Sequence, residues 1–414
     1  MEIRPKLKKW IVNKWGDICR RSHYVLMGLP FVLLTASLVL SIASVVRINQ
    51  VLDGQGMQYG AEEYESKRMP YRQMTVVSTC LPQMDGSAPL KTMNGLDVEK
   101  VKSLHEAIEI TEGSTVGKNG QKKGGEQIDT SRLWKDCYSS FAYYPARGII
   151  EKNETGTIQR CEVVGVSGAY EVVHPLRYEC GGFLPGEEGD QTAIVLNTKM
   201  AWNLFHSYDI AGAFVEMNGI VFQVAGVVNE GDDAIAEKTG VNDARCYVAF
   251  PMLVKLANGP EAPINSSDMD SSVRLEDLAV MNYEVLMVDP IKNIAKNDLT
   301  KAMTDSFGYN KDSLDIQVIN NTGRFNVLTL WKKYFPLKNA YTGFADMTLP
   351  FHERSARLAE QYVVFWAEML IASIILMLTS GGYIYAIFHG KKTKHAKVEE
   401  EEETISELPD IQRV

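Results

Sequence analysis

Two long runs of apolar residues dominate the pattern along this chain. Residues Tyr24–Val46 contain no charged side chain, and Tyr362–Phe388 contain only Glu368. Each run is long enough to cross a hydrocarbon core of about 30 Å as a helix. Backbone groups in hydrocarbon must form hydrogen bonds within their own segment, so both runs should be helical. The pattern therefore predicts two transmembrane helices, residues 24–46 and 362–388.

A cleaved signal peptide is the alternative for the first run. The apolar run is longer than the usual signal-peptide core of about 7–15 residues, and its basic lead-in is long. The small residues at Ser41-Ile42-Ala43 make only a weak cleavage site. A transmembrane helix is therefore the preferred interpretation.

Positive charges flank both apolar runs. Residues 1–23 hold seven Lys or Arg side chains against two acidic ones, and four lysines follow the second run within residues 391–397. Basic flanks stay on the cytoplasmic side of a membrane. We therefore expect both termini in the cytoplasm and residues 47–361 outside the cell (plasma or inner) membrane.

The N-terminal segment, residues 1–23, is predicted to be a cytoplasmic amphipathic helix. Trp10, Ile11, Trp15 and Ile18 can share one face of such a helix, with lysines at its edges. Trp10 and Trp15 are therefore candidate contacts for a partner protein or for lipid. A solvated basic lead-in without a partner is the alternative.

The C-terminal segment, residues 389–414, is a charged cytoplasmic tail. It changes from basic to acidic at Glu399–Glu403. Five consecutive like charges repel one another, so this tail is expected to be solvated and irregular. A docking tail is the alternative.

Between the two apolar runs, short strand patterns alternate with helical ones. Two β-α-β halves are predicted, and their segments are Met74–Leu81, Val98–Ile110 and Ser140–Tyr144, then Tyr283–Val288, Pro290–Phe307 and Leu314–Ile319. Many short strands and turns lie between the halves, at about 156–272. We therefore predict an α+β extracytoplasmic domain with a β-rich insertion.

The clearest local signal lies inside that insertion, at Ala193–Val228. It predicts a strand, a short helix capped by Asn197 or Thr198, and a tight hairpin. Asn218-Gly219 occupies the hairpin turn, because both residues tolerate the positive φ that a type I′ turn requires. This pattern alone is also typical of many soluble α+β domains.

The residues in order are more specific. The stretch contains Leu204-Phe205, Asp209 to Gly212, Asn218-Gly219 and Val224 to Val228. With this series the chain resembles the periplasmic core domain of MacB-type, FtsX-like ABC transporter permeases. Leu349–Glu353, followed by Arg357 and Glu360, also resembles that family's approach to its second span. One departure is Gly181-Gly182-Phe183, where the family often has an arginine before the phenylalanine.

The resemblance implies an architecture and a function. One subdomain is built from the two separated β-α-β halves, and a β-rich subdomain is inserted between them. The family's usual permease has three spans after the ectodomain, whereas one is predicted here. The resemblance thus implies a reduced two-span, noncatalytic subunit. Its implied partners are an ABC ATPase, a second, larger permease subunit and membrane lipid. A two-span sensor or scaffold that binds an extracellular ligand or a wall-associated protein is the alternative.

Motifs for other chemistry do not occur in the sequence. The net charge of −9 provides no basic excess to neutralise nucleic-acid phosphates. The sequence has no Walker motif, no nucleophile-elbow motif and no His-Glu-x-x-His, and its histidines lack ligand spacing. We therefore expect no enzyme activity, no cofactor and no metal.

Two further candidates come from single residue types. Five cysteines fall in the segment expected outside, and Cys161–Cys180 is the favoured disulfide, with buried thiols as the alternative. Glu368 is the one ionisable residue in the predicted spans. It is expected either to contact a neighbouring span or to extend toward the outer interface.

Overall fold

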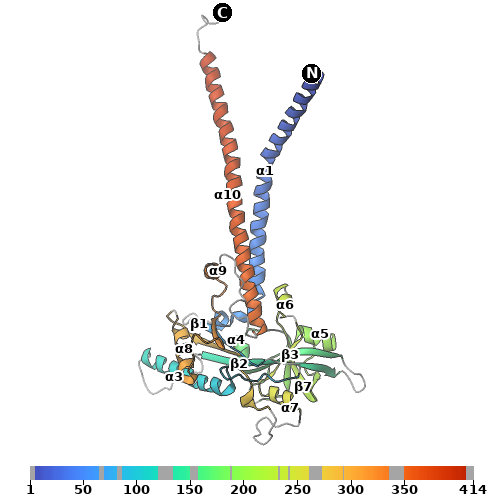
Figure 1. Cartoon of the computed structure of the whole chain (residues 1–414), viewed down its shortest axis with the longest axis vertical. Coiled ribbons are helices and arrows are strands. Elements are labelled where there is room, and N and C mark those ends of the chain that lie inside the picture. Colours follow the sequence, from blue (N-terminus) through green and yellow to red (C-terminus); the bar gives the residue numbers. More distant parts are fainter. Residues whose placement is uncertain are drawn as a thin grey trace, which may run out of the picture. The chain divides into compact units, whose positions relative to one another are not determined.

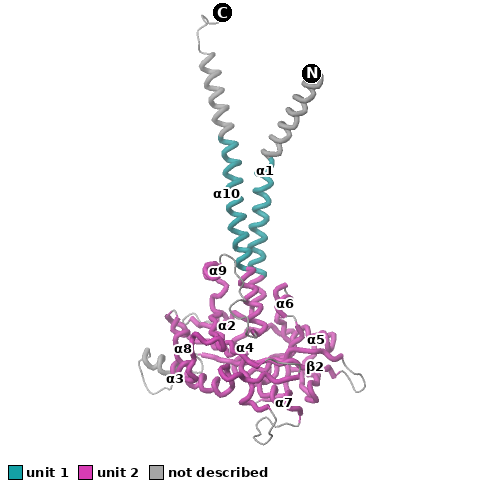
Figure 2. The backbone as a smooth tube through the Cα atoms, in the orientation of Figure 1, with its two compact units in different colours: residues 1–50, 363–414 teal, residues 51–362 magenta. Residues whose placement is uncertain are grey.

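The computed structural model describes residues 5–64, 70–81, 86–119, 134–149, 157–186, 189–231, 234–240, 243–260, 273–291, 293–334 and 349–406. The chain divides into two compact units, coloured separately in Figure 2. The first unit comprises residues 1–50 with 363–414, and the second comprises residues 51–362.

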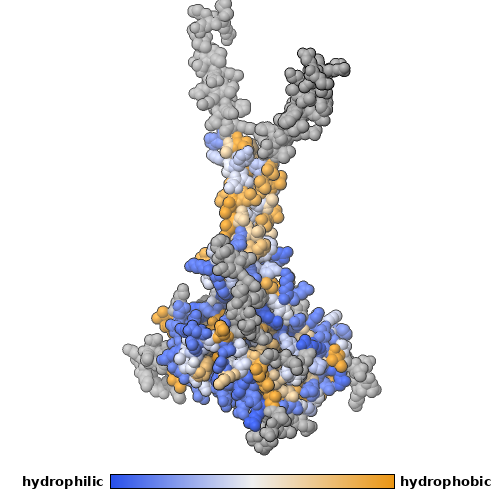
Figure 3. Space-filling view, in the orientation of Figure 1, coloured by the Kyte–Doolittle hydropathy of each residue, from blue (hydrophilic) through white to orange (hydrophobic). Residues whose placement is uncertain are grey.

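The first unit consists of parts of two long helices, α1 (Pro5–Asp53) and α10 (Phe351–Ser406). The segments Gly28–Asp53 and Phe351–His389 are long and apolar enough to cross a membrane. Figure 3 shows apolar side chains gathered along both helices. The two predicted apolar helices are therefore present.

Small polar residues line the contact between these two helices. The hydroxyls of Ser41 and Ser373 lie 2.7 Å apart, and Ser37, Ser44 and Ser380 are buried. Each of these serine hydroxyls also lies within hydrogen-bond distance of a backbone carbonyl of its own helix, and either Ser41 or Ser373 donates its one hydrogen to the other. Small side chains allow close approach of helices in a membrane.

The second unit contains one ten-stranded sheet in the order β10-β1-β9-β2-β3-β8-β5-β7-β4, with β6 paired to β2 and β7. The strands are β1 (Tyr71–Ser78), β2 (Trp134–Ile149), β3 (Ile158–Gly168), β4 (Arg177–Gly181), β5 (Ala193–Asn197), β6 (Phe214–Met217), β7 (Ile220–Asn229), β8 (Arg245–Ala249), β9 (Asn282–Val288) and β10 (Ile316–Asn320).

The two β-α-β halves interleave in this sheet. The first half is β1, α3 (Val98–Asn119) and β2, and the second is β9, α8 (Ile294–Phe307) and β10. Strand β9 lies between β1 and β2, and β1 lies between β9 and β10. The helices α3 and α8 contact each other, with the Ser306 hydroxyl donating to the Ser103 carbonyl. The predicted α+β fold is confirmed.

The inserted segment does not form a separate sheet. Strand β2 is 16 residues long, and it pairs with β9 near its start and with β3 along most of its length. The β-rich insertion therefore extends the same sheet, as Figure 1 shows.

Short helices complete the domain. They are α2 (Gly60–Tyr64), α4 (Tyr170–Val173), α5 (Thr198–Phe205), α6 (Ala234–Thr239), α7 (Met252–Asn258) and α9 (Val327–Tyr334), with 3₁₀ turns at Gly56–Gln58 and Leu275–Asp277. The domain has two main clusters of buried apolar side chains. One contains Leu104 of α3 and Leu299 of α8, and the other contains Tyr170 of α4 and Phe351 of α10.

Two predicted boundaries change. Helix α3 continues to Asn119, beyond the predicted end at Ile110. Helix α10 continues through Glu399–Glu403 to Ser406. The expectation of an irregular tail was therefore wrong as far as Ser406. Continuity with the preceding helix explains the difference, because extending an existing helix avoids the cost of a new nucleus.

Candidate functional site: the polar network at the start of α10

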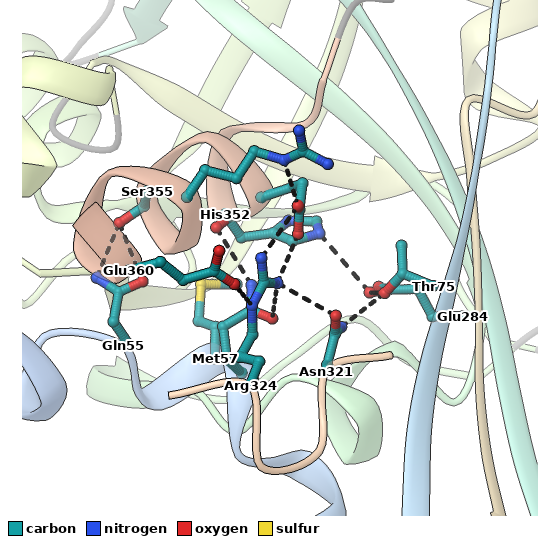
Figure 4. A network of polar contacts seen from close by, with 12 residues as sticks. Gln55, Met57, Thr75, Glu284, Asn321, Arg324, His352, Ser355 and Glu360 are labelled. Atoms are coloured by element: carbon teal, nitrogen blue, oxygen red, sulfur yellow. Dashed lines mark hydrogen bonds and ion pairs between the residues drawn. The ribbon is translucent and has the colours of Figure 1, made fainter. Parts of the chain in front are cut away.

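The first turns of α10 are buried and strongly polar. Residues His352, Glu353, Ser355, Arg357 and Glu360 are all buried within the second unit. Charged side chains are almost never fully buried unless they are paired. Figure 4 shows how these residues meet partners from distant parts of the chain.

Arg324 is the centre of the first cluster, with Glu353 and Glu360. It lies between β10 and α9, and only 4% of its side chain is exposed. Its Nη1 and Nη2 donate to the two Glu353 oxygens at 2.7 and 3.1 Å, and its Nε donates to Glu360 at 2.8 Å. Burial alone would lower the pKa of Arg324, but the two carboxylates outweigh it and raise the pKa. Arg324 therefore stays charged and joins two turns of α10.

Further donors complete this Arg324 cluster. Lys333 donates to Glu360 at 2.9 Å, and the Tyr334 hydroxyl also donates to Glu360. Arg357 donates to Glu353 at 2.6 Å from the next turn of α10. The segment that contains Arg324 and α9 is thus held against α10 by charge-assisted hydrogen bonds, which are the stronger kind.

The chain segment that leaves α1 is joined to the same turns. Gln55 donates to the Ser355 hydroxyl at 2.9 Å, and Gln58 donates to the His352 carbonyl at 3.2 Å. Both glutamines are buried. The segments that follow α1 and begin α10 are therefore tied together inside the second unit.

Arg245 is the centre of the second cluster, with Glu162 and Glu230. Its side chain is fully buried; Nη1 donates to Glu230 at 2.6 Å and Nε donates to Glu162 at 3.1 Å. Its guanidinium carbon lies 3.5 Å from the centre of the Phe351 ring. Burial alone would lower the pKa of Arg245, but these carboxylates raise it. Strands of the insertion therefore contact the first residue of α10.

Glu284 of β9 is the centre of the third cluster, with His174, His352 and Thr75. It accepts from the Thr75 hydroxyl at 2.6 Å and contacts His174, while His352 Nε2 lies 3.7 Å from it. Burial alone would raise the pKa of Glu284, but the histidines lower it to about 2.

Asn321 links the first and third clusters. Its amide donates to Thr75 at 2.7 Å, and its carbonyl accepts from Arg324 at 3.2 Å. A continuous chain of hydrogen bonds therefore runs from α10 through Arg324 to Glu284 in the sheet, as Figure 4 shows. Buried and mutually paired charges hold elements in one arrangement and do not present a reactive group to solvent.

The residues singled out from the sequence lie elsewhere. Asn218 and Gly219 form the two-residue loop between β6 and β7, with φ of 46° and 77° as a type I′ turn requires. Glu368 is half-buried in α10. Residues 5–23 are helical as the start of α1, but the side chains of Trp10 and Trp15 lie outside the described part.

The predicted Cys161–Cys180 disulfide is not formed. Both cysteines are free thiols, and three strands separate β3 from β4 in the sheet. Adjacent strands are about 4.8 Å apart, so these two residues are too distant to bridge. The Cys161 sulfur lies 4.0 Å from that of Cys246 instead.

The Arg324, Arg245 and Glu284 clusters were not predicted as such. The approach to the second span, Leu349–Glu353 with Arg357 and Glu360, was noted only for its family resemblance. Partners such as Arg324 and Arg245 come from other elements, so no local spacing indicates the pairs.

Comparison with known proteins gives structural neighbours only. No protein-family model and no curated protein sequence matches the chain. The structure is similar to the periplasmic region of MacB from Actinobacillus actinomycetemcomitans, with a TM-score of 0.34 and 14% identity over 62% of this chain and 92% of that chain. It is also similar to the extracellular domain of the ABC-type transporter YknZ from Gram-positive bacteria, with a TM-score of 0.34 and 17% identity over 60% of this chain and 100% of that chain.

A third neighbour is a domain of a putative permease protein from Porphyromonas gingivalis. Its TM-score is 0.30 at 8% identity, over 62% of this chain and 91% of that chain. MacB, the first of these neighbours, is also the protein after which the family resembled by the sequence is named. Because these TM-scores are low, the function rests on the site and the sequence pattern.

Proposed function

We propose that this chain is a noncatalytic membrane subunit of a MacB/FtsX-like ABC transporter complex. In this proposal, α1 and α10 cross the cell membrane and both termini are cytoplasmic. An ABC ATPase and a second, larger permease subunit drive movement of the extracytoplasmic domain, residues 51–362, which handles substrate or a partner.

The observation that carries this proposal is the continuity of α10 with a buried ion-pair network. One unbroken helix contains both the apolar run at 362–388 and the polar turns at 351–360. Arg324 and Arg245 attach those turns to two different parts of the sheet domain. A displacement of α10 would therefore be transmitted to both of these parts of the sheet domain and not to a single loop.

The energetics of buried pairs favour rigid transmission. Removing one partner of a buried ion pair costs about 3–5 kcal/mol, because the other charge is left uncompensated. Small movements of α10 relative to Arg324 are therefore opposed strongly. Exposed ion pairs, worth about 0–1 kcal/mol, would break under the same movement.

Co-purification tests the proposal. The full chain, tagged at its C-terminus and extracted with mild detergent from its own cells, should bring an ABC ATPase with it, identified by mass spectrometry. An unrelated two-span protein with the same tag is the control. Recovery of an extracellular or wall-associated protein without an ATPase would instead support a sensor or scaffold.

A further inference from the structure

Three potential metal ligands meet on one face of the sheet. Cys137 of β2 and Glu284 of β9 are directly opposite each other in the β2–β9 register, so their side chains share a face. His174, at the C-terminal end of α4, covers the same place. The Cys137 sulfur, a His174 ring nitrogen and a Glu284 oxygen all lie within 4.8 Å of one another, and all three residues are buried.

The two ring nitrogens of His174 have different partners. Its Nδ1 lies 3.0 Å from the Met57 carbonyl, which can only accept, so Nδ1 carries a hydrogen. Nε2 donates to the Glu284 carboxylate, which can only accept, so a bound metal ion would take the place of the hydrogen on Nε2. A metal-bound histidine usually donates its other ring N–H to a backbone carbonyl or a carboxylate, as His174 Nδ1 does to Met57.

Two buried polar atoms around this cluster lack a partner. The Tyr170 hydroxyl and His352 Nδ1 have no hydrogen bond to any residue that the structure describes. The Tyr170 and His174 ring centres are 4.6 Å apart, as are the His174 and His352 ring centres. Buried polar atoms normally find a partner, so the surroundings of His174 are suited to a further bound group.

We propose that Cys137 Sγ, His174 Nε2 and the Glu284 carboxylate bind one zinc ion. Sulfur, nitrogen and oxygen ligands together suit zinc, whereas Mg²⁺ and Ca²⁺ prefer oxygen alone. Zinc–ligand distances of about 2.0–2.3 Å place tetrahedral ligand atoms about 3.3–3.8 Å apart, so His174 and Glu284 would separate and an atom up to 4.8 Å away would move closer. As the ion binds, the Cys137 thiol and His174 Nε2 each release a proton to solvent.

His352 is the candidate for the fourth coordination position, where its Nε2 would exchange a 3.4 Å contact with the Asn282 amide for the ion. Its Nε2 lies 3.7 Å from Glu284 Oε1. A closed four-ligand site is typical of structural zinc. Because His352 belongs to the first turn of α10, the ion would fix this turn to β2, β9 and α4. The inference is independent of the transporter proposal.

The sequence did not indicate this site, because its ligands are far apart along the chain. Cys137 and His174 are 37 residues apart, and His174 and Glu284 are 110 residues apart. Only the pairing of β2 with β9 and the position of α4 bring them together.

Elemental analysis of the purified full chain is the direct test. We expect about one zinc per chain to survive dialysis against a weak chelator. Cys137→Ser and His174→Gln should each lose that zinc, and His352→Gln should weaken its retention. Cys161→Ser is the matched control, because Cys161 is another buried cysteine of the sheet with a second sulfur, that of Cys246, beside it. The control should keep its zinc.

Cobalt substitution keeps the proposal testable if a variant fails to fold. The wild-type chain, stripped and refilled with Co²⁺, should show a thiolate-to-cobalt charge-transfer band and should regain its melting midpoint. A wild-type chain without zinc, without that band and without a metal-dependent midpoint would leave His174 and Glu284 as a simple ion pair and overturn the proposal. Equal zinc in wild type and Cys137→Ser would overturn it as well.

Discussion

At the residue scale, backbone conformation constrains the β6–β7 turn more than packing does. A Cβ atom added at Gly219 would lie 3.5 Å from Pro260, an ordinary contact, but the φ of 77° is strained for any side chain. We expect Gly219→Val to lower the free energy of unfolding by about 1–3 kcal/mol. The loss of stability is measured as a lower melting midpoint of the full chain.

A control separates backbone strain from side-chain size. A Cβ atom added at Gly186 would meet no heavy atom within 4 Å, and its φ lies outside the positive range that strains a side chain, so Gly186→Val should change the midpoint much less. Equal effects of the two variants would contradict strain as the cause.

A single histidine should make stability depend on pH. His105 Nδ1 lies 2.8 Å from Asp136, and this hydrogen bond raises the pKa of His105 above 6.5. A raised folded-state pKa stabilises the fold fully below pH 6.5, and the contribution is lost as pH rises through the raised value. His105→Gln should therefore lower the melting midpoint at pH about 5.5 and much less at pH about 9.

A double-mutant comparison isolates the His105 pair. In an Asp136→Asn background, the difference between the His105→Gln midpoint shifts at the two pH values should become smaller, because only Glu106 and Glu109 still raise the pKa of His105. An unchanged difference there would exclude Asp136 as the main cause.

At the element scale, the Arg324 cluster connects the segment before α9 to α10. Arg324→Gln leaves the buried carboxylates of Glu353 and Glu360 without their main partner, so we expect a loss of about 3–5 kcal/mol in unfolding free energy. Arg324→Lys should lose less unfolding free energy than Arg324→Gln but more than none, because lysine keeps the charge but lacks the planar guanidinium group. The denaturant midpoint of the full chain measures the differences.

The matched control is an exposed arginine pair. Arg274 and Glu276 are 3.3 Å apart, with side chains 42% and 48% exposed. Arg274→Gln should change the free energy by at most about 1 kcal/mol. Similar losses for Arg324→Gln and Arg274→Gln would show that burial does not strengthen the Arg324 cluster.

Elements with a strong local pattern could be predicted from the sequence. The two apolar helices and the two β-α-β halves each have a hydrophobic period that a single segment reveals. The clusters could not be predicted, because Arg324 and Glu353 meet only after β10 and α10 are placed. The Cys161–Cys180 error has the same origin: strand order in a sheet is not a local property.

At the scale of the whole molecule, the basic flanks predict which side of the membrane each part occupies. Met93 is 96% exposed within the sheet domain, and Lys394 lies in the tail. In a background where the half-buried Cys80 and Cys180 are serine, a membrane-impermeant thiol reagent should label Met93→Cys in intact cells. It should label Lys394→Cys only after permeabilisation. Labelling of the tail in intact cells would exclude cytoplasmic termini.

The contact with other subunits is predicted to involve the start of α1. Residues 5–23 are helical, and helical periodicity puts Trp10 and Trp15 on one apolar face. Replacing both by Glu puts charge on that face and opposes its burial against protein or lipid. Because the apolar run at 24–46 is unchanged, the double variant should still insert into the membrane, yet lose co-purification with the ATPase.

The matched control adds the same charge to the opposite face. By the same periodicity, Asn13 and Gly16 lie away from the tryptophans, so Asn13→Glu with Gly16→Glu should keep the ATPase in the purified complex. Membrane insertion of both variants is measured by carbonate extraction, and ATPase recovery by quantitative mass spectrometry. Full ATPase recovery with the tryptophan variant would exclude the start of α1 as the contact. The buried serine contacts between α1 and α10, and half-buried Glu368, would then be the next places to test.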